Sequence, residues 1–148
     1  MPEKETVERA KEDAREGKSA STQAGEFVRE EIHHIRKGKH GARSAEQAIA
    51  IALSKARRAG VKLGTPKSTN STASTRHKAE LDSASAKHPH KPARKRSRAT
   101  EGALKRKGKA AVSKKALSRQ ARSASKMGGR KQRVSAAKKV VRTRKSRA

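Results

Sequence analysis

Histidines capable of binding a metal ion or transferring a proton gather in the segment EFVREEIHHIRKGKHG (26–41). His33 and His34 are adjacent, and His40 follows a glycine turn. A structural zinc ion usually takes four ligands, often including cysteine, but the chain has no cysteine and no repeated His-x3-His on one helix face. We therefore expect these histidines at a solvated helix edge and predict no metal site. A proton-sensitive contact with a phosphate or an acidic partner is the alternative.

Other catalytic arrangements find no support in the residue pattern. Glu30 and Glu31 are neighbours in sequence, but adjacent residues of a helix point about 100° apart. This geometry predicts a solvated acidic face and no carboxylate pair. No serine stands in a Ser/His/Asp arrangement, and the absence of cysteine removes thiol nucleophiles. We predict that the protein is not an enzyme, with no cofactor and no small-molecule substrate.

The composition points to a polyanionic partner. The chain of 148 residues carries 41 Lys and Arg against 13 Asp and Glu, a formal net charge of +28, with one Phe and no Trp or Tyr. Its longest apolar run, AIAIAL (48–53), is far shorter than the ~20 residues of a membrane span. The first residues resemble neither a signal nor a transit peptide. We expect a cytoplasmic location, no membrane partner, and association with nucleic acid.

The charge divides the chain into a head, a linker and a tail. The head (1–64) holds 14 Lys and Arg against 10 Asp and Glu, whereas residues 65–148 hold 27 against 3. Residues 65–92 are rich in Ser and Thr at their start and predict a flexible linker. Residues 93–148 form a basic Lys/Arg/Ala/Ser-rich tail, which we expect to be largely disordered with nascent helices. The predicted fold class is mainly α.

Three helices are predicted in the head, over about 3–16, 22–37 and 45–59. Gly38 can end the second helix, and a Ser-x-x-Gln capping box can begin the third. The short basic loop between them predicts an antiparallel helix pair. Because such a pair buries little apolar area, we expect self-association or a partner surface, with a marginal monomer as the alternative. The predicted head core comprises Phe27, Val28, Ile32, Ile35, Ile49 and Leu53.

Nucleic-acid contacts are expected mainly from the tail, with a contribution from the polar side of the helix pair. Without Tyr or Trp, the chain lacks the aromatic platforms on which single-stranded bases stack, so contact with duplex phosphates is favoured. Binding should be tolerant of sequence and should weaken steeply with salt. The predicted contact residues are Lys39, Arg43, Lys55, Arg57, Arg58, Arg94, Lys95, Arg96, Arg98, Lys105, Arg106, Lys107, Lys114, Lys115, Arg130, Lys131, Arg133, Lys138, Lys139, Arg142, Arg144 and Lys145.

The run STQAGEFVREEIHHIRKGKHGARSAEQAIAIALSKARRAG (21–60) is similar to an uncharacterised bacterial family of short basic proteins, known only as a domain of unknown function. The opening MPEKETVERAKEDAREGKSAS resembles the start of that family, and residues 95–125 resemble the basic tail of many members. The resemblance implies no activity. The tail also resembles linker-histone tails, in composition only.

These observations favour a sequence-tolerant protein that binds duplex DNA and is associated with the bacterial nucleoid, in the manner of a histone-like protein. Structured RNA is a possible ligand as well. The alternative is an interaction or regulatory module whose helical head docks on a partner protein while the tail holds it near nucleic acid.

Overall fold

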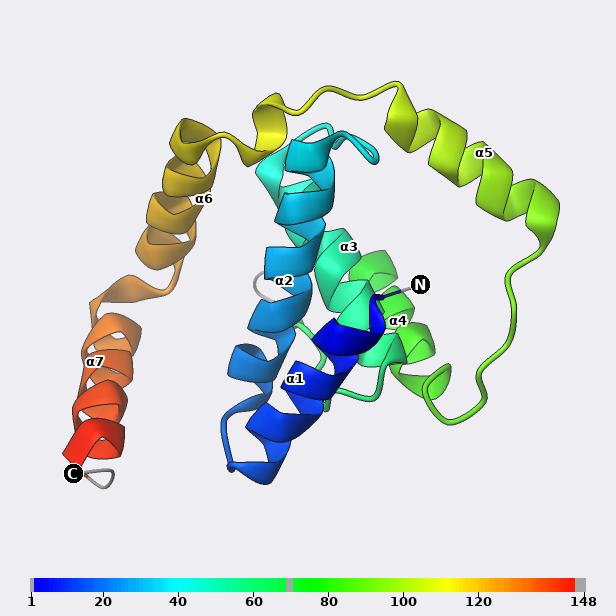
Figure 1. Ribbon diagram of the computed structural model, residues 1–148. Coiled ribbons are helices and arrows are strands. Elements are labelled where there is room, and N and C mark those ends of the chain that lie inside the picture. Colours follow the sequence, from blue (N-terminus) through cyan, green and yellow to red (C-terminus); the bar gives the residue numbers. More distant parts are fainter. Residues whose placement is uncertain (1, 69–70, 146–148) are drawn as a thin grey trace. The chain divides into compact units, whose positions relative to one another are not determined.

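The computed structural model describes residues 2–68 and 71–145, which form helices and, within these ranges, no strand (Figure 1). Of residues 130–133, 136, 143 and 145 it describes the backbone alone. The prediction of a mainly α fold is confirmed. The chain divides into two compact units, residues 1–112 and residues 113–148. The first unit is therefore much longer than the predicted head.

Three helices open the first unit: α1 (Lys4–Arg15), α2 (Ala20–Lys37) and α3 (Ala45–Arg58). They lie where 3–16, 22–37 and 45–59 were predicted. The Ser19 hydroxyl accepts a hydrogen bond from the Thr22 amide at the start of α2, and Gly38 ends α2 with φ 80°, a left-handed conformation that suits glycine. At the start of α3, the Ser44 hydroxyl accepts from the Gln47 amide.

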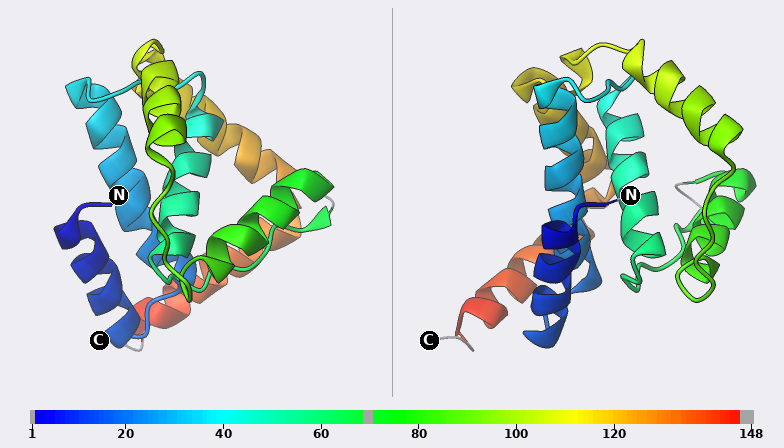
Figure 2. Two further views of the ribbon diagram at one scale, coloured as in Figure 1. Left: turned by 90° about the vertical axis from the view of Figure 1, so that its right-hand side faces the viewer. Right: turned by 45° about the vertical axis from the view of Figure 1, so that its right-hand side comes forward.

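The helix pair packs through alanines as much as through large side chains. Phe27 and Ile35 are fully buried, as predicted, whereas Val28, Ile32, Ile49 and Leu53 are only half-buried. The buried positions of α3 are small, because Ala48, Ala52 and Ala56 are all nearly inaccessible to solvent. Small side chains let the two helix backbones approach closely, so a tight contact forms with few large residues. α1 also packs against α2 (Figure 2), and its Ala10 joins the core that contains Phe27 and Ala52.

A fourth helix, α4 (Ala73–Ala84), lies within the segment predicted to be a flexible linker (65–92). The Thr72 hydroxyl caps it by accepting from the Thr75 amide. It packs on α3, where Asp82 accepts hydrogen bonds from Ser54 at 2.6 Å and from Arg58 Nε at 2.8 Å. The expectation of a flexible linker is therefore wrong for α4, because a buried carboxylate ties this helix to the head.

A segment of the predicted tail returns to the head and covers one end of the helix pair. After α5 (Arg94–Lys105), residues 104–112, here called the strap, run past the loop between α2 and α3. The Gly41 amide donates to the Leu104 carbonyl at 3.0 Å, and the Ala42 amide donates to the Gly108 carbonyl at 3.2 Å. The strap ends in a 3₁₀ turn, η2 (Ala110–Val112), which packs against α2 and α3.

The strap completes a second small core. Val112 is only 1% exposed and packs with Ile35, Ala42 and Ala48, with Ile32 at the edge. Burial of one valine and one alanine of the strap covers the end of the pair that the head sequence leaves open.

The second unit contains α6 (Lys114–Met127) and α7 (Gly129–Lys145), which contact each other. The prediction of a largely disordered tail is not confirmed, since α5, α6 and α7 are helical over the described residues. No side chain of α5 or α6 is buried, so burial does not explain their helicity. Alanine, lysine and arginine are strong helix formers, which gives these helices their local preference.

Candidate functional site

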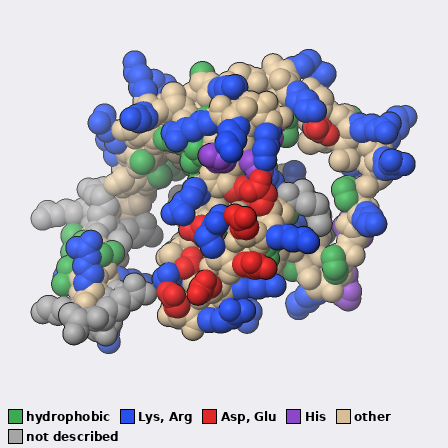
Figure 3. All heavy atoms as spheres, in the orientation of Figure 1, with side chains coloured by type: hydrophobic (Ala, Val, Ile, Leu, Met, Phe, Trp, Pro, Cys, Tyr) green, Lys and Arg blue, Asp and Glu red, His purple; other side chains and the backbone are tan. Residues whose placement is uncertain are grey.

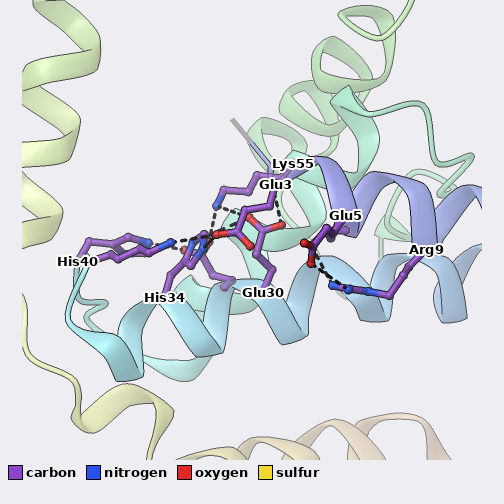
Figure 4. A network of polar contacts seen from close by, with 10 residues as sticks. Glu3, Glu5, Arg9, Glu30, His34, His40 and Lys55 are labelled. Atoms are coloured by element: carbon purple, nitrogen blue, oxygen red, sulfur yellow. Dashed lines mark hydrogen bonds and ion pairs between the residues drawn. The ribbon is translucent and has the colours of Figure 1, made fainter.

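A network of charged side chains fills the space between α1, α2, α3 and the loop that follows α2 (Figure 4). Its centre is Glu31 of α2, whose side chain is 0% exposed. Lys55 of α3 donates to Glu31 Oε2 at 2.7 Å. The other carboxylate oxygen, Glu31 Oε1, has no hydrogen-bond partner, although His40 Nε2 lies 3.4 Å from it.

A second buried carboxylate lies one residue earlier in α2. Glu30 Oε2 accepts a hydrogen bond from the Glu3 amide at 3.1 Å, which ties the start of α1 to α2. Glu30 Oε1 is buried and has no hydrogen-bond partner; Lys55 Nζ and His34 Nδ1 lie 3.7 and 3.8 Å from it. Two oxygens of buried carboxylates are therefore unsatisfied in one small region, which is uncommon in folded proteins.

His34 lies between Glu30 of α2 and Glu3, the residue that precedes α1. Its Nε2 lies 2.8 Å from Glu3 Oε1, which also accepts from Lys39 at 2.9 Å. The hydrogen bond with His34, followed by that with Lys39, lowers the pKa of Glu3 to about 2 from the usual 4.5. His34 is only 7% exposed, and its ring meets that of His40 edge to face at 6.3 Å between centroids.

The geometry overturns the expectation of a solvated helix edge. His34, Glu30 and Glu31 are buried, while His33 is exposed. Within the part of the chain that the structure describes, Glu31, His34 and His40 are one group whose ligand atoms all lie within 4.8 Å of one another. The available signal was the i, i+4 spacing of Glu30 and His34, which places a carboxylate and an imidazole on the same helix face.

Most of the head cations predicted to bind phosphates are engaged within the first unit. Lys39 pairs with Glu3, and Lys55 pairs with Glu31. Arg58 pairs with Asp82, and Arg57 is buried and donates to the Gly64 carbonyl. Arg43 is exposed, with its backbone amide bound to Gln47. The loop between α2 and α3 is also covered by the strap, so it is no open anion site.

The predicted contact residues in the tail lie mostly at the surface. Lys105 forms an ion pair with Glu101 at 2.8 Å, which lowers the pKa of Glu101, and Lys107 is half-buried in the strap. The side chains of Arg130, Lys131, Arg133 and Lys145 lie outside the described part of the chain. The others are exposed: Arg94, Lys95, Arg96, Arg98, Arg106, Lys114, Lys115, Lys138, Lys139, Arg142 and Arg144.

The prediction missed three cations of α6. Arg119, Arg122 and Lys126, together with Lys115, line one surface hollow along this helix. At 100° per residue, their spacing of i, i+4, i+7 and i+11 places them within an arc of about 60°. This periodicity was readable in the sequence. Figure 3 shows that most of the Asp and Glu side chains in view gather in one region, while Lys and Arg side chains are spread widely over this face.

No helix within residues 2–68 and 71–145 is both long and apolar enough to cross a membrane. Neither a protein-family model, nor a curated protein, nor a solved structure matches the chain. The resemblance of residues 21–60 to an uncharacterised bacterial family therefore stays a prediction, and the function must be argued from the geometry of the chain itself.

Proposed function

We propose that the protein binds duplex nucleic acid, with little sequence preference, through the cations of its basic tail (93–148). The observation that carries the proposal is the cationic face of α6, formed by Lys115, Arg119, Arg122 and Lys126. These side chains are exposed, and α6 contains no acidic residue. Over residues 115–126 the helix rises about 16 Å, along which a duplex presents one phosphate charge per ~1.7 Å.

Two further helices supply exposed cations of the same kind. α5 begins with Arg94, Lys95, Arg96 and Arg98, all at the surface, and α7 carries exposed Lys138, Lys139, Arg142 and Arg144. Displacing the counterions of a duplex gives binding free energy that depends on the number of phosphates neutralised and not on the bases. Tolerance of sequence follows from this mechanism.

The aromatic inventory argues against single-stranded ligands. The chain has one aromatic side chain of the Phe, Tyr or Trp type, Phe27, and it is 1% exposed in the core of the first unit. Recognition of single strands relies on stacking of bases on exposed aromatic rings. Duplex DNA is therefore the favoured ligand, and structured RNA remains within the proposal because its phosphates offer the same charge.

The test compares two quadruple variants of equal net charge. In the first, Lys115, Arg119, Arg122 and Lys126 are changed to Gln. The matched control changes four exposed lysines of the first unit to Gln: Lys4, Lys11, Lys37 and Lys62. Affinity of the full chain for duplex DNA, duplex RNA and heparin is measured as a function of salt concentration.

The α6 variant should reduce the slope of log K against log salt by up to about 3–4, because each lost phosphate contact removes about 0.9 from it. The control variant should change the slope by less than about 1. If both variants lower the slope by the same amount, net charge alone explains the binding and α6 is not a specific part of the interface. If the unsubstituted chain does not bind duplex DNA or duplex RNA at physiological salt, the proposed function is wrong.

A further inference from the structure

We propose that Glu31, His34 and His40 form a binding site for one divalent transition-metal ion of the zinc class. The three ligand atoms lie within 4.8 Å of one another, and the side chains are buried or half-buried. Two imidazoles and one carboxylate are a donor set that zinc and neighbouring first-row metals use in proteins. None of the three ligands lies in the basic tail, although the strap contacts the loop that carries His40, and the proposal does not rest on the proposed function.

The tautomer of His40 provides the first argument. Its Nδ1 lies 3.2 Å from the Gly41 carbonyl oxygen, which can only accept a hydrogen bond, so Nδ1 carries the proton. In a neutral imidazole the lone pair then lies on Nε2, which faces Glu31 Oε1 at 3.4 Å. An ionised carboxylate is also an acceptor only. Two lone pairs therefore point at each other across a buried gap, and a cation between them resolves the conflict.

His34 repeats the same pattern. Its Nε2 lies 2.8 Å from Glu3 Oε1, an acceptor, which leaves the lone pair of a neutral ring on Nδ1. Nδ1 faces the interior, 3.8 Å from the unsatisfied Glu30 Oε1. Each histidine thus has its outer nitrogen held by an oxygen acceptor, which is how metal-binding histidines are commonly oriented.

The separation of one pair of ligand atoms matches a metal of zinc size, whereas the three atoms together lie within 4.8 Å of one another. Two ligand atoms at about 2.1 Å from a tetrahedral ion lie roughly 3.4 Å apart. The separation between His40 Nε2 and Glu31 Oε1 is 3.4 Å. Lys55 occupies Glu31 Oε2 at 2.7 Å and leaves Oε1 turned towards His40. Glu30 Oε1, which is buried and has no hydrogen-bond partner, is not one of these three ligand atoms and lies 3.8 Å from His34 Nδ1.

The local charge also favours a cation. Three carboxylates, from Glu3, Glu30 and Glu31, meet two lysines, Lys39 and Lys55. Glu3 and Lys39 are half exposed and offset each other. The buried Glu30 and Glu31 share the single lysine Lys55, which leaves one uncompensated negative charge when the imidazoles are neutral. Such a charge is costly unless an ion or a proton neutralises it. A divalent ion bound by Glu31, His34 and His40 would satisfy the orphaned Glu31 Oε1 and the lone pairs of both imidazoles at once.

The test titrates Zn²⁺ into the full chain after treatment with a chelator. His88→Ala/His90→Ala is introduced as the background, because the exposed His-Pro-His of residues 88–90 can bind zinc weakly on its own. Calorimetry should give one Zn²⁺ per chain. In this background Glu31→Gln and His34→Ala should each weaken Zn²⁺ binding by at least 10–100-fold. Loss of a group that only hydrogen-bonds to a metal ligand already has an effect of this size. The matched control His33→Ala, which removes an exposed neighbour, should stay within about twofold of the background.

Because Glu31 and His34 are buried, a second measurement uses the unsubstituted chain. Zn²⁺ should shift the imidazole ¹⁵N resonances of His34 and His40 in nuclear magnetic resonance spectra, while His33 stays unchanged. Absence of binding at micromolar Zn²⁺ would overturn the proposal. Shifts confined to His77, His88 and His90, or equal affinities of His34→Ala and His33→Ala, would overturn it as well.

Discussion

Gly41 decides whether the strap can lie on the helix pair. A Cβ atom added at this position would lie 1.8 Å from the Lys107 carbonyl oxygen, 2.3 Å from the Lys107 carbonyl carbon and 2.7 Å from the Gly108 oxygen. All three are backbone atoms, so rotation of a side chain cannot relieve the clash. We predict that Gly41→Ala releases the strap from the head.

The size of the effect follows from what the strap contributes. Two backbone hydrogen bonds, from the amides of Gly41 and Ala42, are lost at about 0.5–1.5 kcal/mol each. Exposure of Val112 adds roughly 1.5–3 kcal/mol. Released residues regain backbone entropy, which offsets part of this sum. We expect a net loss of about 1–3 kcal/mol in the free energy of strap docking.

Hydrogen exchange of the Ala42 amide is the direct assay. Since 1.4 kcal/mol corresponds to a factor of ten, protection of this amide should fall by about five- to 150-fold. Amides in the middle of α2 and α3 should keep most of their protection, because the core around Phe27, Ala52 and Ala56 contains no residue of the strap.

Gly25→Ala is the matched control. A Cβ atom at Gly25 would meet nothing within 4 Å, and the residue lies in the interior of α2. Alanine there should stabilise the helix by about 0.5–1 kcal/mol. If Gly41→Ala leaves the Ala42 amide as protected as it is in Gly25→Ala, the strap is not held by close backbone contact and the reasoning fails.

Two further predictions concern the anchors of α1 and α4. In chelator-treated protein, the lowered pKa of Glu3 means that the unfolded state binds more protons between the usual pKa of 4.5 and about 2. The stability contributed by Glu3 is therefore present above pH 4.5 and lost as the pH falls towards 2. The temperature of thermal unfolding should depend less on pH in Glu3→Gln over this range. The same pH dependence in Glu3→Gln and in the unsubstituted chain would contradict the prediction. Asp82→Asn should weaken the contact with Arg58 by about 1–3 kcal/mol and speed proteolysis within α4. Glu80→Gln, at an exposed position of the same helix, should leave the rate of proteolysis unchanged.

The helices of the head were predictable because their signals are local. Ser44 and Gln47 lie three residues apart and mark the start of α3 whatever packs around them. Gly38 marks the end of α2 in the same way, with its left-handed backbone. Such signals need only the chemistry of one helical turn, so they survive without knowledge of the tertiary structure.

The strap was not predictable because its evidence lies far apart in the sequence. Val112 reads as an isolated valine in a basic stretch, and only its contact with Ile35 and Ala48 shows that it completes a core. In the sequence Gly41 resembles any other loop glycine, and only the structure shows the Lys107 carbonyl lying where a Cβ atom would be. Long-range pairing of this kind leaves no periodic trace in either segment.

The buried carboxylates were missed for a different reason. In an isolated antiparallel pair, α2 would have one buried face, directed at α3, and Glu30 and Glu31 would lie in solvent. In the structure α1 and α3 both pack against α2, and the Glu3 amide and Lys55 cover the two acids. A helix with neighbours on two sides has little polar face left, so charged residues become buried and must be paired.

Folding therefore separates two populations of charge in this chain. Before residue 93, carboxylates bind the nearby lysines and arginines: Asp13 pairs with Lys18, whose pKa rises as a result, and Asp82 pairs with Arg58. The tail has too few acids for this, since Glu101 is the only carboxylate after residue 92 and it binds Lys105. Substitutions of paired cations in the first unit should consequently change stability before affinity. Substitutions on α6 should change affinity for a polyanion before stability, because no side chain there is buried.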